Sequence, residues 1–238
     1  MAYIDGFVAA VPADNRQSYL EHATAVVPIF HEFGVRRMVE TWGDDVPEGH
    51  TTDFYRAVKA KDGEVIVFAW LEYPDKAARQ AAGERMMTDP RLQRSMETMP
   101  FDAKRMIYGG FEIVSDERAD GRPSGYVDGS LVAIANERKA EFTVWTNGIA
   151  KIFIEHGASR VVDAWGDDVP DGEVTDFKGA VQADDGETVA YTWVEWPDRA
   201  TRDKGWVSVM ADQRMHQGDM PFDGRRMVMG GFSTLLDA

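Results

Sequence analysis

The chain carries the segment Trp-Gly-Asp-Asp-Val-Pro twice, at residues 42–47 and at residues 165–170. A longer segment, Met-Pro-Phe-Asp followed by Arg-Met and then Gly-Gly-Phe, also recurs, at residues 99–111 and 220–232. The two copies keep a constant offset of 123 residues until a two-residue deletion before Met220. One domain is therefore written twice, and whatever fold the first copy adopts, the second copy must adopt as well.

The repeat divides the 238 residues into two units of about 115 residues, and each unit is long enough to bury a core of its own. Between the copies lies a polar stretch without hydrophobic periodicity, at residues 115–125, which is typical of a linker. We predict a first repeat at residues 1–115, a linker at residues 116–125 and a second repeat at residues 126–238.

Each copy shows strand and helix patterns in the order βαββαβ, which is the ferredoxin-like arrangement. The strand patterns of the first copy lie at residues 3–11, 36–42, 65–73 and 105–114. Because the helices of this fold cover only one face of an antiparallel sheet, the other face needs a partner. We therefore predict an α+β protein in which two ferredoxin-like repeats pack sheet to sheet as an intramolecular α/β barrel, a pseudo-dimer.

The composition excludes several classes of function. The chain has no cysteine, which excludes disulfides and thiolate sites. Its net charge is −15, and nucleic acids are bound mainly by neutralising phosphates with Lys and Arg, so we expect no nucleic-acid partner. No apolar run approaches the ~18 residues of a membrane span, and residues 1–5 lack the features of a signal peptide. We expect a cytoplasmic protein that does not bind membranes.

Both copies resemble the YbaA-like family of bacterial proteins. The resemblance rests on Asp-Gly-Phe at residues 5–7, Asp-Pro-Arg at residues 89–91 and both copies of the two recurring segments, and it covers nearly the whole chain. The family belongs to the dimeric α/β-barrel superfamily, which also holds small cofactor-free monooxygenases and usually builds its barrel from two identical chains. The resemblance implies that this chain forms the barrel internally, and we expect no cofactor.

Four acidic residues inside the predicted strands are the candidates for chemistry. A buried carboxylate is expensive unless it is paired. Beside a tryptophan, desolvation would raise its pKa and suit it to act as a general base. These candidate catalytic residues form two matched pairs, one in the second strand and one in the third: Glu40 with Asp163, and Glu72 with Glu195.

Aromatic residues share strand faces with these acids, because strand side chains alternate. Glu40 shares a face with Trp42, and Glu72 shares a face with Trp70. If these faces line the barrel, each half surrounds one cavity with apolar walls and a few polar groups, as ligand sites do. The candidate ligand-binding residues are Trp42, Trp70, Arg105, Tyr108, Trp165, Trp193 and Arg226. The alternative is that Arg105 and Arg226 only neutralise carboxylates in structural ion pairs.

Neither the histidines nor the paired aspartates predict a metal. None of the five histidines, His22, His31, His50, His156 and His216, has a histidine at the matching position of the other copy, although a one-sided site could use His31. Adjacent aspartates such as Asp44 and Asp45 are the oxygen ligands that Ca²⁺ prefers, but Asp before Val-Pro is ordinary turn chemistry. We favour the turn.

Three functional hypotheses remain. The first is a module that binds a small, partly apolar molecule in or beside the barrel. The second is a cofactor-independent enzyme, monooxygenase-like or isomerase-like, that uses an in-strand carboxylate. The third is a structural or interaction protein with a filled barrel, and further self-association of the pseudo-dimer is possible in each case. Matched positions differ, as in Phe7 and Ser130, so two sites are not expected to be equivalent.

Overall fold

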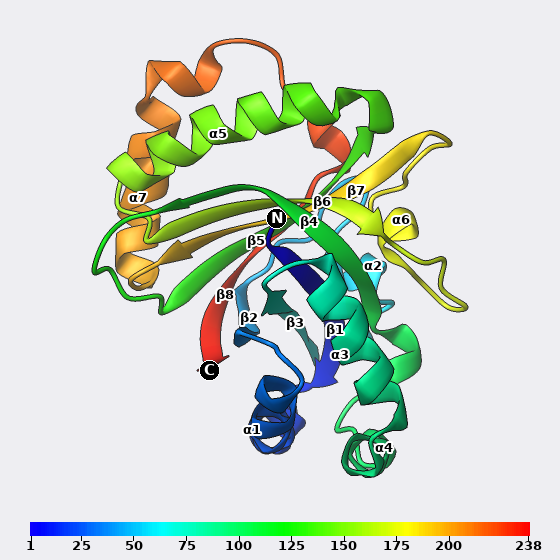
Figure 1. The fold of residues 1–238 in the computed structure, drawn as a ribbon. Coiled ribbons are helices and arrows are strands. Elements are labelled where there is room, and N and C mark those ends of the chain that lie inside the picture. Colours follow the sequence, from blue (N-terminus) through cyan, green and yellow to red (C-terminus); the bar gives the residue numbers. More distant parts are fainter.

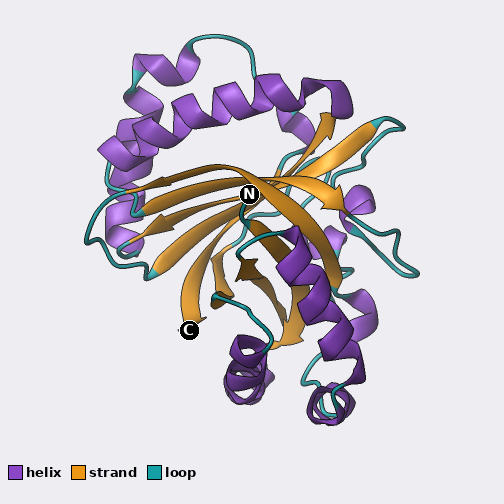
Figure 2. Cartoon of the chain, in the orientation of Figure 1, coloured by secondary structure: helices purple, strands orange, loops and turns teal.

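The computed structural model describes all 238 residues, and its eight strands form one closed barrel in the order β1-β3-β2-β8-β5-β7-β6-β4 (Figures 1 and 2). The first repeat contains β1 (Tyr3–Pro12), α1 (Arg16–Glu32), β2 (Arg37–Asp45), α2 (Phe54–Ala57), β3 (Glu64–Tyr73), α3 (Lys76–Thr88), α4 (Pro90–Glu97) and β4 (Ile107–Arg118). The second contains β5 (Tyr126–Ala135), α5 (Lys139–Glu155), β6 (Arg160–Asp168), α6 (Phe177–Ala180), β7 (Glu187–Trp196), α7 (Arg199–Ala211) and β8 (Val228–Asp237). The predicted fold class is thus confirmed.

The barrel closes because both edge strands of the first repeat pair with the edge strands of the second repeat. β2 pairs with β8, and β4 pairs with β6, both antiparallel. No sheet edge is left open to pair with another chain. The pairing of β4 with β6 reaches Arg118 opposite Arg160, so the last strand of the first repeat continues into the stretch that we predicted as linker.

The interior of the barrel is filled by aromatic side chains in matched pairs. Phe68 stacks on Tyr191 with ring centroids 4.3 Å apart, and Trp70 packs on Trp193 at 4.5 Å. The partners of each pair occupy equivalent positions of the two repeats, so they meet near the internal twofold axis. A Cβ atom on Gly129 would lie 2.8 Å from the Phe68 ring, which explains why glycine stands there. The lumen is a packed core.

The recurring Trp-Gly-Asp-Asp-Val-Pro segment joins the two repeats. β2 and β6 run to its second aspartate, and these carboxylates bind helices of the opposite repeat. Asp168 accepts from Arg79 on α3 at 2.5 Å, and Asp45 accepts from Arg202 on α7 at 2.8 Å. The first aspartate of each segment also forms an ion pair with the opposite repeat: Asp44 with Arg199 on α7, and Asp167 with Lys76 on α3. Our interpretation of these aspartates as turn residues is therefore wrong.

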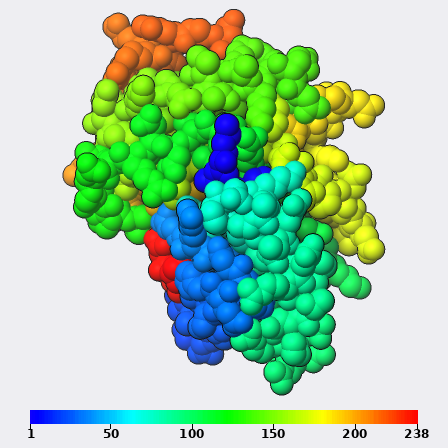
Figure 3. All heavy atoms as spheres, viewed as in Figure 1, coloured from blue at the N-terminus to red at the C-terminus, as the bar shows by residue number.

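The longer helices lie outside the barrel in two groups, one for each repeat (Figure 2). The short helices α2 and α6 contact each other, and their Phe54 and Phe177 side chains pack into the core of the barrel. In the space-filling view, α1, α3 and α4 form a blue-to-teal lobe at one side, and α5, in green, lies at the opposite side (Figure 3). Asp75 begins α3 by accepting a hydrogen bond from the Ala78 amide, which is ordinary N-cap chemistry. None of the helices is long and apolar enough to cross a membrane.

Candidate functional site

Glu72 on β3 and Glu195 on β7 face the barrel interior at one end, and both carboxylates are paired with arginines. Arg160 binds Glu72, and Arg37 binds both oxygens of Glu195 at 2.8 and 2.9 Å. The indole of Trp70 also donates to Glu72. Although burial favours the protonated form, the hydrogen bonds from Arg160 lower the pKa of Glu72. These two acids form a charged network between the repeats and leave no free carboxylate for a substrate.

The structure does not bring the other candidate ligand residues together around one cavity. Trp70 and Trp193 lie inside the barrel, whereas Trp42 and Trp165 pack outside it, under α1 and α5. Glu40 shares the outer face with Trp42, so the acids of the second and third strands point to opposite faces of the sheet.

The two candidate arginines and Tyr108 lie elsewhere again. Arg105 binds Glu64 at 2.6 Å, and Arg226 binds Glu187 at 2.7 Å. Both pairs tie the start of the third strand to the turn before the fourth. Tyr108 is half exposed. The arginines thus have the arrangement of structural ion pairs.

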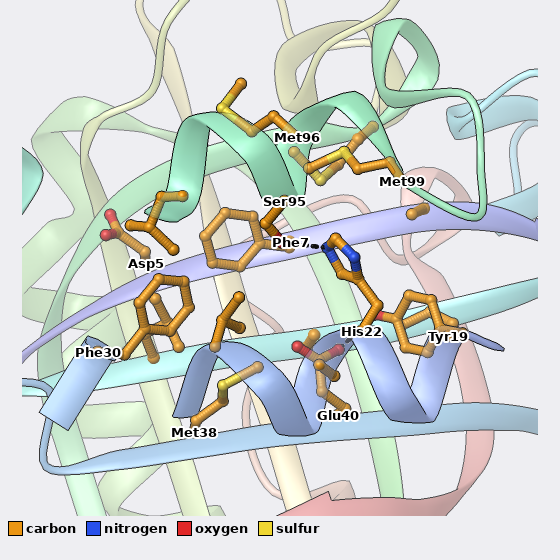
Figure 4. Close-up of a pocket in the computed structure, with 18 of the residues that line it drawn as sticks. Asp5, Phe7, Tyr19, His22, Phe30, Met38, Glu40, Ser95, Met96 and Met99 are labelled. Carbon is orange, nitrogen blue, oxygen red and sulfur yellow. Dashed lines mark hydrogen bonds between the residues drawn. The ribbon is translucent and has the colours of Figure 1, made fainter. Parts of the chain in front are cut away.

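A cavity of about 310 Å³ lies beside the barrel in the first repeat, between the outer face of β1, β3 and β2 and the helices α1, α3 and α4 (Figure 4). Seventeen of its 21 lining residues are hydrophobic. This size and composition are typical of a small-molecule site. The apolar lining residues are Phe7, Ala9, Tyr19, Ala23, Val26, Phe30, Met38, Val67, Ala69, Leu71, Met86, Met87, Leu92, Met96, Met99, Phe101 and Met106.

Glu40 is the central polar group of this cavity. Its carboxylate accepts a hydrogen bond of 2.5 Å from the Tyr19 hydroxyl, and its residue is only 9% exposed. No Lys or Arg pairs with it. Burial raises the pKa of Glu40 to about 7, against which the hydrogen bond from Tyr19 acts in the lowering direction. A carboxyl group with this pKa can both accept and return a proton near neutral pH.

Three further polar residues line the cavity: Asp5, His22 and Ser95. His22 on α1 and Ser95 on α4 lie 3.4 Å apart and join the two helices across the cavity (Figure 4). Burial lowers the pKa of His22, which favours its neutral imidazole. Asp5 is bound by Arg79 at 2.7 Å, and Arg79 also binds Asp168 of the other repeat. One wall of the cavity is therefore braced by the second repeat.

The matching region of the second repeat is occupied by tryptophan. Trp206, which replaces Gly83, donates to Asp128 at 2.7 Å, and its ring lies 5.1 Å from that of Phe153. Asp128 and Phe153 are the counterparts of the lining residues Asp5 and Phe30. Trp145 replaces His22, and its ring lies 5.4 Å from Phe222, the counterpart of Phe101.

The second repeat also lacks counterparts of the hydrogen-bonded pair Tyr19 and Glu40 and of helix α4. Phe142 replaces Tyr19 and Asp163 replaces Glu40, so the hydroxyl that Glu40 uses is absent. Burial raises the pKa of Asp163 to about 7. The residues that follow α7 form only a short 3-10 helix, Gln213–His216, in place of α4.

Glu40 was among the candidates from the sequence, but the residues that surround it were not. Tyr19 and His22 were not among the candidates. The available signal was the comparison of the copies, since Tyr19, His22 and Gly83 each face a bulkier or less polar residue at the matching position. His31, the histidine singled out for a one-sided site, instead contacts the Val35 carbonyl.

Solved structures with the same fold span the whole chain. A "putative monooxygenase" from Lactobacillus acidophilus aligns with a TM-score of 0.60 and 7% identity, over 100% of this chain and 95% of the other. One of the same description from Fusobacterium nucleatum aligns with a TM-score of 0.61 and 10% identity, over 99% and 93%. An anthrone oxidase-like protein aligns with a TM-score of 0.51 and 10% identity, over 100% of this chain and 92% of the other. At these identities the likeness shows the fold alone.

Sequence relatives are much closer and half as long. The uncharacterized protein YbaA of Escherichia coli K12 is 56% identical over 117 residues, which are 49% of this chain and 100% of that protein. YbaA of Shigella flexneri gives the same values. The profile of the family described as "Protein of unknown function (DUF1428)" matches twice, at residues 2–103 and 125–224. The chain therefore belongs to this family and contains its domain in two fused copies.

Proposed function

We propose that the first repeat binds one small, largely apolar molecule in the cavity beside the barrel. The observation that carries this proposal is a 310 Å³ cavity with an apolar wall and one buried carboxyl group, Glu40. Protein interiors leave little apolar space unfilled, because an unfilled apolar cavity costs stability, so an apolar cavity of this size favours a ligand. The filled lumen favours a site beside the barrel over one inside it.

The variants for the test are taken from the second repeat, where tryptophans fill the space that corresponds to the cavity. Gly83→Trp should place an indole against Asp5 and Phe30, as Trp206 lies against Asp128 and Phe153. His22→Trp should fill the other end of the cavity. Wild-type protein is titrated with the neutral dye N-phenyl-1-naphthylamine, and fluorescence and calorimetry report affinity and stoichiometry.

We expect wild type to bind one dye molecule per chain, and each variant to bind the dye at least about tenfold more weakly than wild type. Val144→Trp is the matched control, since Val144 is 76% exposed on α5 and its replacement should leave binding unchanged. Absence of binding to wild type, or equal binding by Gly83→Trp, contradicts the proposal.

The second candidate function is proton-transfer catalysis without a cofactor. It is favoured by the position of Glu40 in the cavity and by a pKa of about 7, which suits a general base or acid at neutral pH. A panel of quinone and aldehyde substrates is assayed with Glu40→Gln and with Glu72→Gln. Loss of turnover only in Glu40→Gln supports this function, and unchanged turnover in both variants removes these carboxylates from the mechanism.

Location and partners belong to the same proposal. We propose a cytoplasmic protein that does not bind nucleic acid. The 41 acidic residues against 26 basic residues support the second statement, because nucleic acids are bound mainly through Lys and Arg. Cell fractionation and a mobility-shift assay with DNA and RNA test the two statements, and a shift at physiological salt contradicts the second.

A further inference from the structure

The cavity has an unusual charge balance for an apolar site. Its lining holds two acidic residues and no Lys or Arg, and burial lowers the pKa of its histidine, His22, which favours the neutral imidazole. A ligand with a carboxylate or phosphate group would be buried there without a cationic partner. Burying an unpaired charge is strongly unfavourable, so this lining favours neutral and cationic ligands over anions.

The two acids are not equivalent. Asp5 is bound by Arg79, whose guanidinium lies 2.7 Å away, and its charge is therefore compensated. Glu40 has the Tyr19 hydroxyl on Oε2 as its single hydrogen-bond partner. Figure 4 shows its carboxylate near helix α1, beside Tyr19 and His22, and Glu40 is one of the lining residues of the cavity. Glu40 is thus the one buried carboxylate of the cavity without a cation.

Aromatic rings surround the space into which Glu40 faces. Phe7, Tyr19, Phe30 and Phe101 all line the cavity. The face of an aromatic ring carries negative potential and attracts cations, and thioether side chains such as those of Met38 and Met99 are soft and adaptable partners. An ammonium group would therefore find a carboxylate to pair with and rings to pack against, while its apolar body fills the rest of the cavity.

We propose that the ligand of this cavity is a lipophilic amine, bound as its ammonium ion with the charge paired to Glu40. This inference rests on the proposed function, because it names the class of molecule that the same cavity takes. The hydroxyl of Tyr19 holds the carboxylate in place for the ion pair. The second repeat is not expected to share this property, because Phe142 and two tryptophans occupy the corresponding positions.

The test compares three ligands with one ring system and different charges: 1-naphthylmethylamine, 1-naphthalenemethanol and 1-naphthoate. Affinities are measured by calorimetry at pH 8, where the amine is protonated and Glu40 is ionised. A charge-assisted hydrogen bond in a buried site is worth about tenfold or more in affinity. We expect the amine to bind at least about tenfold more tightly than the alcohol, and the carboxylate to bind most weakly.

Two variants assign the preference to Glu40. Glu40→Gln should bring the amine to within about threefold of the alcohol, whose own affinity should hardly change. Asp163→Asn is the matched control, because it removes an equally buried carboxylate from the second repeat and should leave the preference for the amine intact.

The outcomes separate this inference from the proposed function. If none of the three ligands binds although the dye does, the inferred class of ligand is wrong; if the dye does not bind either, the proposed function itself fails. If the alcohol or the carboxylate binds as tightly as the amine, or if Glu40→Gln keeps the preference, the cavity binds ligands but the inferred class is wrong.

Discussion

Glu40→Gln should stabilise this protein at alkaline pH, which is the opposite of what most substitutions of buried residues do. In the unfolded chain the carboxyl group has a pKa near 4.5, and in the fold burial raises the pKa of Glu40 to about 7. The folded state therefore holds a proton that the unfolded state has released between these two values. The free energy of unfolding must fall as the pH rises through this window.

The structure gives the size of the effect. Each pKa unit corresponds to about 1.36 kcal/mol, so the rise from 4.5 to about 7 amounts to about 3 kcal/mol at pH 8, as an upper value. Gln has no charge to bury, and its side-chain oxygen can still accept from Tyr19. We expect the variant and the wild type to be equally stable at pH 4, and the variant to be more stable by up to about 3 kcal/mol at pH 8.

The assay is urea unfolding followed by tryptophan fluorescence at half-unit steps from pH 4 to 8.5. A stability difference that does not change with pH, or a variant less stable than wild type at pH 8, refutes the reasoning. Glu72→Gln is the control, because this substitution should lower the free energy of unfolding, whereas Glu40→Gln should raise it. Arg160 lowers the pKa of Glu72, and breaking a buried ion pair costs about 3 kcal/mol or more at neutral pH. A stabilising change at a cavity residue is the mark of a site kept for function at the expense of stability.

The other predictions concern how the repeats are joined and filled, and each uses the same unfolding assay at pH 7. Arg79→Ala leaves the largely buried Asp5 without a cation and should cost about 3 kcal/mol. Asp168→Ala removes a half-exposed partner of the same arginine and should cost less than about 1 kcal/mol; equal costs would show that the link between the repeats matters more than the charge of Asp5. Gly129→Val would drive a side chain into the Phe68 ring, 2.8 Å from the added Cβ, and should cost about 1–3 kcal/mol. Gly148→Ala, with no atom within 4 Å of the added Cβ in α5, should instead stabilise by about 0.5–1 kcal/mol, and a loss of stability there would contradict the packing that we describe.

Comparison of the two copies also bears on single-copy relatives. The ion pairs between the repeats use aspartates of the recurring segment and basic residues of α3 and α7. Each repeat contributes the same set to the other, as in a twofold interface. A relative that contains one copy of this domain is therefore expected to form the barrel from two chains, which sedimentation of such a protein would test.

The sequence by itself determined the pairing and the fold. An identical segment at a constant offset can only mean two copies of one domain, and the βαββαβ order with one uncovered sheet face requires a partner. Because the second copy is the nearest partner available, the intramolecular barrel follows. The sequence also pointed to the in-strand acids, including Glu40, because a carboxylate in a buried strand is unfavourable unless it is paired.

Tertiary structure alone decided which face of the sheet each acid occupies. Alternation along a strand tells which residues share a face, but in this fold both faces are apolar, one covered by helices and the other by the opposite sheet. Periodicity therefore cannot assign Glu72 to the interior and Glu40 to the outer face. It also cannot show that α4 stands away from the sheet and leaves a cavity, which depends on packing between distant segments. The asymmetry of the copies at Gly83 and Trp206 was visible in the sequence, but its meaning required the neighbours that only the fold supplies.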